Sequence, residues 1–260
     1  MFNTVLVRPL FNLLMLIYGV VPGHDFGIAV IIMTILVRLL LWPILAQQLR
    51  SQKKMQNLAP EVARVKKQSK GDRQLESKLL MELYKEKEIN PFASFVPLII
   101  QFPLFIALYL ALRDVIKPGE VAHLIYPALH NIAAIKTIIA HPADFKPSLF
   151  GHVDLAKVNV VLAAIAGGTQ YFQTKQLLPK KIEPGDSQAQ ALASTSKIFP
   201  VLTFLIGLRL PSALALYWAV SSGVAILQQS IELKEDVSDL EKVTVKQPSS
   251  AKLKPEKAKK

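Results

Sequence analysis

Four long apolar segments, separated by polar stretches, dominate the pattern of the chain. They cover residues 26–45, 94–113, 155–174 and 196–231, and such runs of about 18 or more mostly apolar residues predict transmembrane helices. As a helix, the last segment would be about 54 Å long at about 1.5 Å per residue, which is too long for one crossing. A reversal at Leu210-Pro211-Ser212 divides it into spans 196–210 and 211–231. The pattern therefore predicts an all-α integral membrane protein whose core, residues 24–231, has five transmembrane helices.

The N-terminal residues 1–23 form a weaker apolar segment. Apolar residues recur at helical spacing within 8–21, which is too short to span a bilayer, so we expect an interfacial amphipathic helix on the outer leaflet. No small-x-small cleavage site follows it, which argues against a cleavable signal peptide and leaves a signal-anchor remnant as the alternative.

The polar stretches predict further elements. In 46–90, apolar residues recur every three or four positions on both sides of Lys70-Gly71-Asp72, which predicts a helical hairpin whose entering helix breaks near Ala59, next to Pro60. Loop 114–153 has an apolar middle, 124–139, that we expect to form one helix on the membrane surface. Residues 175–195 are predicted to be a short polar connection, and the charged tail, 232–260, to be disordered.

Charge sets the predicted orientation. The formal net charge is +12, and region 46–90 alone holds eleven Lys and Arg, whereas loop 114–153 holds three. Because positive charge is retained on the cytosolic side, we expect the N-terminus outside, loop 114–153 extracytoplasmic, and both the hairpin and the basic tail in the cytosol. The chain has no cysteine, which excludes disulfides, thiolate metal sites and a lipidated cysteine.

Arg38 lies near the middle of the first apolar segment, which contains no acidic residue. An arginine at the centre of a membrane helix raises the free energy of insertion by about 2.5–3.5 kcal/mol. The apolar neighbours offset this cost, but they do not solvate the charge. The other apolar segments offer no carboxylate to pair with it. We therefore expect a hydrated cavity beside Arg38, in which an anionic ligand could displace water.

Other polar side chains lie within the predicted spans. Since unsatisfied polar groups are costly in hydrocarbon, we expect them to gather around one hydrated groove near Arg38. Taken singly, each could instead be a hydrogen-bonding group between helices. The candidates are Thr34, Gln101, Gln170, Gln173, Tyr217, Trp218 and Ser221.

The predicted spans contain no motif typical of an enzyme active site. The spans contain no carboxylate pair, no serine with an intramembrane histidine, no H-E-x-x-H and no glycine-rich phosphate loop. We therefore predict a protein without catalysis, nucleotide hydrolysis, metal or cofactor, and without specific recognition of nucleic acid.

Several short motifs resemble, in order, those of the YidC/Oxa/Albino-type membrane protein insertases. The match extends from about Pro9 to Ile231. The motifs are Phe26 to Ile32, Arg38 to Pro43, Gln47-Gln48, Met55 to Glu61, Leu83 to Glu86 with Asn90-Pro91, Leu98 to Pro103, Tyr171 to Lys175, Phe199-Pro200, Leu216 to Trp218, and Gln228-Gln229.

The resemblance implies a function. A five-helix core would enclose a hydrophilic groove, open to the cytosol and to lipid, in which Arg38 receives polar segments of nascent membrane proteins. Gln173 and Trp218 would line this groove, with Gln170 and Thr34 as neighbours, and the 46–90 hairpin would be a mobile cytosolic lid. Nascent membrane proteins and lipid would be the partners, the ribosome and the Sec translocon would be further candidates, and the protein would be a monomer in the bacterial plasma membrane.

The chain departs from this family in two features, and two rival functions remain. Loop 114–153 is longer than expected for this family, and the basic tail is short for ribosome binding. An anion transporter with Arg38 as its binding site would require an inverted repeat or a pathway open to the outside, and the sequence shows no internal repeat. A structural assembly factor acting through the hairpin would not need Arg38.

Overall fold

The computed structural model describes residues 2–87, 89–90, 101–110, 124–142, 145–178 and 187–233, and they are mainly helical. The first half contains η1 (Asn3–Val7), α1 (Arg8–Val20), η2 (Pro22–His24), α2 (Phe26–Asn57), α3 (Ala59–Ser69), α4 (Arg73–Glu86) and the helix Gln101–Leu110. The second half contains η4 (Pro127–Leu129), α7 (Ala133–Ala140), β1 (Ser148–Leu149), β2 (Val153–Asp154), α8 (Val160–Gln176), α9 (Ser187–Gly207) and α10 (Ser212–Glu232). The predicted all-α integral membrane class is confirmed.

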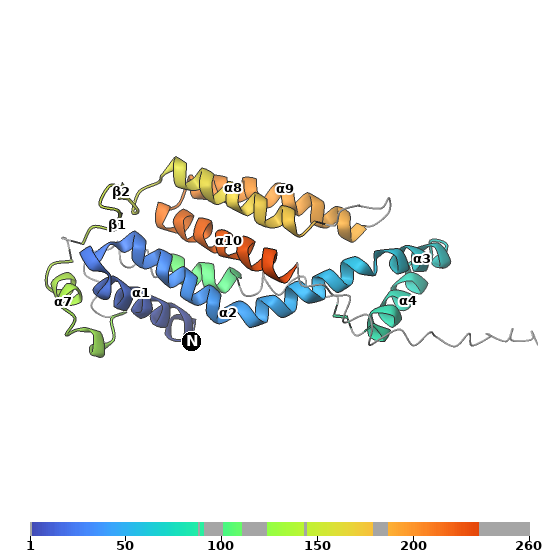
Figure 1. Cartoon of the computed structure of the whole chain (residues 1–260), viewed down its shortest axis with the longest axis horizontal. Coiled ribbons are helices and arrows are strands. Elements are labelled where there is room, and N and C mark those ends of the chain that lie inside the picture. Colours follow the sequence, from blue (N-terminus) through green and yellow to red (C-terminus); the bar gives the residue numbers. More distant parts are fainter. Residues whose placement is uncertain are drawn as a thin grey trace, which may run out of the picture.

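Helix α10 lies between α2 and α8, and α9 packs mainly on α8 (Figure 1). Small residues bring these helices close together. A Cβ atom added at Gly207 of α9 would lie 2.9 Å from the Cβ atom of Ala163 in α8, and one added at Gly167 would lie 3.1 Å from the Cβ atom of Phe204. Such small-residue contacts are the usual means by which membrane helices pack, because lipid supplies no hydrophobic force to hold them together.

The number of crossings stays a prediction. Within the described residues, three helices are long and apolar enough to span a membrane: Asn3–Val20, α2 and α10. The first is longer than predicted, because one turn of π-helix, η1, continues directly into α1. Its residues Phe11, Leu14 and Met15 are fully buried against the rest of the protein. Half of the predicted second span, 94–113, lies outside the described residues.

The predicted hairpin is present. Helix α2 continues beyond the first span to Asn57, and Leu58 joins it to α3, which has Pro60 in its first turn. The turn uses Lys70 and Gly71 in left-handed conformations, with φ of 49° and 92°. Asp72 then caps α4, since its carboxylate accepts hydrogen bonds from two backbone N–H groups of the first turn.

The single helix predicted for 124–139 is wrong. Residue 124 is still helical, but residues 125–126 are not, residues 127–129 form only a 3₁₀ turn, and the α-helix resumes as α7. Asn12 of α1, 4% exposed, explains the difference because its side chain binds the backbone of this segment. Its Nδ2 atom donates to the Leu124 carbonyl at 2.8 Å, and its Oδ1 atom accepts from the Tyr126 N–H group at 2.6 Å. The Arg8 guanidinium also lies 5.0 Å from the centre of the Tyr126 ring.

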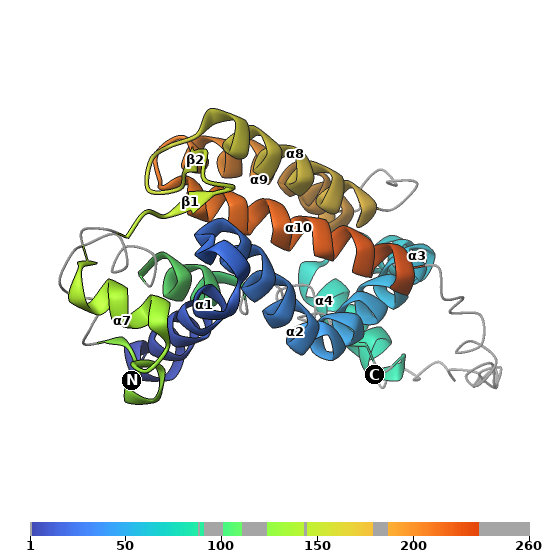
Figure 2. The same ribbon diagram turned by 60° about the vertical axis from the view of Figure 1, so that its left-hand side comes forward.

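A two-stranded antiparallel hairpin, β1–β2, precedes α8 and was not predicted (Figure 2). Residues 155–159, predicted to begin the third span, are not helical. Their carbonyl groups instead accept hydrogen bonds from the first turn of α10: the Ser212 N–H group donates to Lys157 and the Ala213 N–H group to Leu155. The extended segment thus satisfies donors that a helix N-terminus leaves free.

The predicted connection 175–195 is partly helical. Helix α8 ends at Gln176, and α9 begins at Ser187, nine residues before the predicted start of the fourth span. The reversal between the fourth and fifth predicted spans is confirmed, because α9 ends at Gly207 and α10 begins at Ser212. The tail from residue 234 onward lies outside the described residues.

We expect Gly27→Ala to lower the thermal stability of the protein. A Cβ atom at Gly27 would lie 2.6 Å from the Cβ atom and 2.9 Å from the Cα atom of Leu149 in β1, so the hairpin backbone would have to move. Overpacking of this kind costs about 1–3 kcal/mol. Gly168→Ala is the matched control, because a Cβ atom there meets no atom within 4 Å. Equal melting temperatures for the two variants in detergent would contradict the close contact.

Candidate polar site around Arg38

Helix α2 places Arg38 on the side of the helix that faces the bundle. The helix begins with Asp25 as its N-cap, whose carboxylate accepts a hydrogen bond from the Ile28 N–H group at 2.8 Å. Leu39 and Leu40 are exposed, as expected for side chains in contact with lipid. Arg38 is only partly exposed and turns toward α10.

Two neutral side chains hold the guanidinium. Its Nε atom donates to the Ser221 hydroxyl of α10 at 2.8 Å, and its Nη2 atom donates to Oε1 of Gln101 at 3.4 Å. The Gln101 amide in turn donates to the Tyr217 hydroxyl at 2.8 Å. Among the described residues no carboxylate forms an ion pair with Arg38. The positive charge is therefore hydrogen-bonded but not neutralised by these partners.

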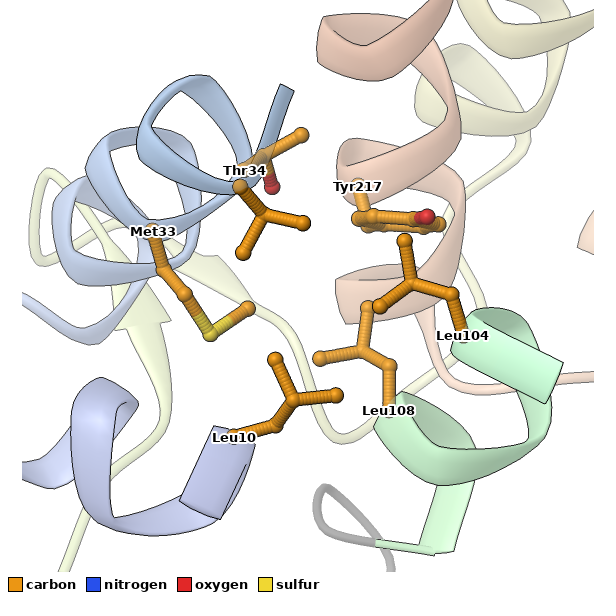
Figure 3. Close-up of a pocket in the computed structure, with 7 residues that line it drawn as sticks. Leu10, Met33, Thr34, Leu104, Leu108 and Tyr217 are labelled. Carbon is orange, nitrogen blue, oxygen red and sulfur yellow. The ribbon is translucent and has the colours of Figure 1, made fainter. Parts of the chain in front are cut away.

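Apolar side chains close the space next to this polar network. A small cavity of about 10 Å³ lies one helical turn away, with room for about one water molecule. The Thr34 hydroxyl donates to the Val30 carbonyl of its own helix at 2.6 Å. Figure 3 shows the side chains that surround the cavity and come from four helices: Leu10, Met33, Thr34, Leu104, Leu108 and Tyr217.

The remaining predicted groove residues lie on another side of α10. The Gln170 side chain of α8 accepts a hydrogen bond from the Ser222 hydroxyl at 3.2 Å. The Trp218 ring packs against Phe105, with ring centres 4.8 Å apart, and against small residues of α8 and α10. Gln173 is half-buried in α8. Successive residues of an α-helix point about 100° apart, so adjacent Ser221 and Ser222 contact different helices.

The structure brings some of the predicted groove residues into direct contact with Arg38 and not others. The structure joins Arg38, Gln101, Tyr217 and Ser221 directly, and places Gln170 in a separate hydrogen bond. Whether these side chains line one continuous groove stays a prediction.

A second polar cluster, at the end of α10, was missed. The Glu232 side chain is 6% exposed and accepts from Arg50 Nε at 3.1 Å and from Trp42 Nε1 at 3.3 Å. The Gln228 amide donates to the Trp42 carbonyl at 3.0 Å. Glu232 lies in the segment 232–260 that was predicted to be a disordered tail. The sequence does contain a signal for this cluster: Glu232 directly follows one apolar span, and Arg50 follows another.

Fold and site together define a helical membrane protein with an arginine held by neutral groups inside its bundle and a polar helical hairpin at one end. Comparison with protein families gives the same class. The family model described as 60Kd inner membrane protein matches residues 16–238. The chain therefore belongs to this family, and the YidC/Oxa/Albino-type resemblance is confirmed.

Curated relatives named membrane protein insertase YidC are similar over most of this chain. Those of Clostridium tetani and Fusobacterium nucleatum subsp. nucleatum are each 30% identical over 84% and 81% of the chain, which in both cases spans 87% of the relative. That of Methylobacillus flagellatus is 34% identical over 87% of the chain, which spans 35% of that longer relative.

We expect Tyr217→Phe to destabilise the bundle by about 1 kcal/mol, because the Gln101 amide would lose its acceptor within the protein. The hydroxyl is the only group removed from this buried side chain. Tyr171→Phe, at an exposed position of α8, is the control and should change nothing. The measurement is the melting temperature of each variant in lipid nanodiscs. A Tyr217→Phe variant as stable as the control would show that the Gln101 bond contributes no stability.

Proposed function

We propose that this protein is a membrane protein insertase which receives polar segments of nascent membrane proteins beside Arg38 and releases apolar segments sideways into the bilayer. Its membership of the 60Kd inner membrane protein family and the name shared by its curated relatives support this proposal. The mechanism rests on one observation: in the described part of the chain, the Arg38 guanidinium is hydrogen-bonded to neutral oxygen atoms.

Among the described residues, neutral groups alone bind the Arg38 guanidinium, so its positive charge keeps its attraction for an anion. It has five N–H donors, of which Ser221 and Gln101 engage two. An incoming carboxylate or backbone carbonyl can bind the remaining donors without first displacing a bound acid. In surroundings of lower dielectric constant than water, that attraction is several times stronger than in bulk solvent. Acidic and polar leader segments are thus the expected ligands.

The surroundings of Arg38 favour entry from one side. The cavity lined by Leu10, Met33 and Leu108 is small and apolar, so a polar segment gains nothing by passing it. Together with the positive-inside orientation, this supports a hydrophilic groove that opens to the cytosol and ends at Arg38. Gln170, Gln173 and Trp218 would contact the substrate further along the groove.

Burial of the substrate drives the reaction. Each large apolar residue of a nascent span gains about 0.3–0.6 kcal/mol in the bilayer, and about twenty such residues outweigh the transfer of a short polar leader. The insertase therefore needs to lower the barrier for the leader only, and no nucleotide has to be hydrolysed. The α3–α4 hairpin would guard the cytosolic entrance, and the ribosome and the Sec translocon are proposed as partners.

We expect Arg38→Ala to reduce the insertion of substrates with acidic leaders by about tenfold more than that of substrates with neutral leaders. The reason is the loss of an attraction of about 1.4 kcal/mol, which corresponds to a factor of ten. The measurement is the insertion of matched single-span substrates into proteoliposomes that contain the purified protein.

Arg209→Ala is the control for this experiment, because it removes an exposed arginine between α9 and α10. It should affect both substrates equally and weakly. Equal loss for acidic and neutral leaders in Arg38→Ala would remove the electrostatic mechanism. Unchanged insertion with Arg38→Ala would favour the assembly-factor alternative, whereas uptake of small anions without insertion would favour the transporter.

A further inference from the structure

Helix α2 is longer than a membrane span. Its 32 residues extend for about 48 Å at about 1.5 Å per residue, compared with a hydrocarbon core of about 30 Å. Its last residues, 46–57, continue beyond the predicted span and lead directly into α3 and α4 (Figure 1). We call residues 46–57 the α2 stalk, because any tilt of this segment moves the whole hairpin.

Three polar residues of the stalk, spaced three apart, contact the ends of two other helices. Arg50 Nε donates to the Glu232 carboxylate at 3.1 Å, and Lys53 Nζ donates to the Leu233 carbonyl at 3.0 Å, both at the end of α10. Gln56 donates to the Leu177 carbonyl, at the end of α8, at 2.7 Å. The stalk is thereby bound to the C-terminal ends of α10 and α8.

Glu232 is the unusual member of this set. A carboxylate at the C-terminus of a helix is repelled by the negative end of the helix dipole, and Glu232 is the last residue of α10. Its side chain is also 6% exposed, whereas that of Arg50 is 52% exposed. A buried acid at such a position requires partners, and Trp42 and Arg50, both on α2, provide them. Its contacts favour a role in joining the two helices.

The same two helices are therefore joined at two levels. Arg38 of α2 binds Ser221 of α10, and about three turns further along both helices Arg50 binds Glu232. Contacts at Arg38 alone would allow α2 to pivot on α10, whereas the further contacts of Trp42, Arg50 and Lys53 with the end of α10 define the direction of the stalk.

We propose that Glu232 is a positioning residue, whose contacts with Arg50 and Trp42 set the direction of the α2 stalk and thereby the place of the α3–α4 hairpin over the cytosolic end of the bundle. The geometric part of this proposal is independent of the insertase function. Its effect on insertion rests on that proposed function.

The test is a distance measurement between two spin labels. Since the chain has no cysteine, labels can be attached through Gln68→Cys in the hairpin and Lys197→Cys in α9, both at exposed positions. In nanodiscs we expect a narrow distance distribution with Glu232 present. Glu232→Gln and Arg50→Gln should each broaden or shift it, and the double variant should add little, because both remove the same ion pair.

Lys54→Gln is the matched control, since it removes one positive charge from the stalk next to Lys53 and should leave the distribution unchanged. Arg50→Gln keeps the test valid if Glu232→Gln fails to fold, because the Arg50 side chain is half exposed. An unchanged distribution in Arg50→Gln, or additive effects in the double variant, would overturn the proposal.

Insertion measurements separate this proposal from the proposed function. We expect Glu232→Gln to slow insertion by about two- to fivefold for acidic and neutral leaders alike, because it displaces the hairpin without changing Arg38. A loss restricted to acidic leaders would overturn the positioning role in insertion. If Arg38→Ala inserts every substrate normally while the spin-label distances change as expected, the insertase mechanism fails and the positioning of the hairpin stands.

Discussion

The arrangement of the bundle depends on keeping one positive charge away from lipid. Arg38 can lie at its depth in α2 only if other helices supply oxygen atoms, and Ser221 and Gln101 do so from two directions. Each of these contacts requires its helix to approach α2 closely. Helix α10 and the helix Gln101–Leu110 must therefore pack against α2 for the guanidinium to be buried. The same two helices form the walls of the site around Arg38.

Helix α10 has a different partner on each side. Through Ser221 it binds Arg38, through Ser222 it binds Gln170 of α8, and through Glu232 it binds the stalk of α2. Because these contacts point in different directions from one rigid helix, a shift of α10 would disturb all of them together. Small residues at Gly207 and Ala163 let α9 approach α8 and complete the layer. The polar and the close-packed contacts thus support a single arrangement of the helices.

Local signals explain what could be predicted from the sequence. The reversal at 208–211 and the turn at Lys70-Gly71 follow from proline, glycine and the length of the apolar run, and Arg38 was identified from its isolation. The break in the helix at residues 125–126 could not be predicted, because the backbone of Leu124 and Tyr126 binds Asn12, more than a hundred residues away. Likewise, nothing local distinguishes Ser221 from Ser222, or shows that Glu232 meets Arg50, since those differences arise only when helices pack.

The contact between Asn12 and Tyr126 also constrains the order in which the chain acquires its structure during synthesis. The first helix emerges from the ribosome long before residues 124–126, whose backbone completes the hydrogen bonds of Asn12. Until those residues are translated, the amide of Asn12 can bind the Arg8 carbonyl of its own helix, to which it also donates at 2.8 Å, or water. The N-terminal helix therefore acquires these contacts only after about half of the chain is made, although it is made first.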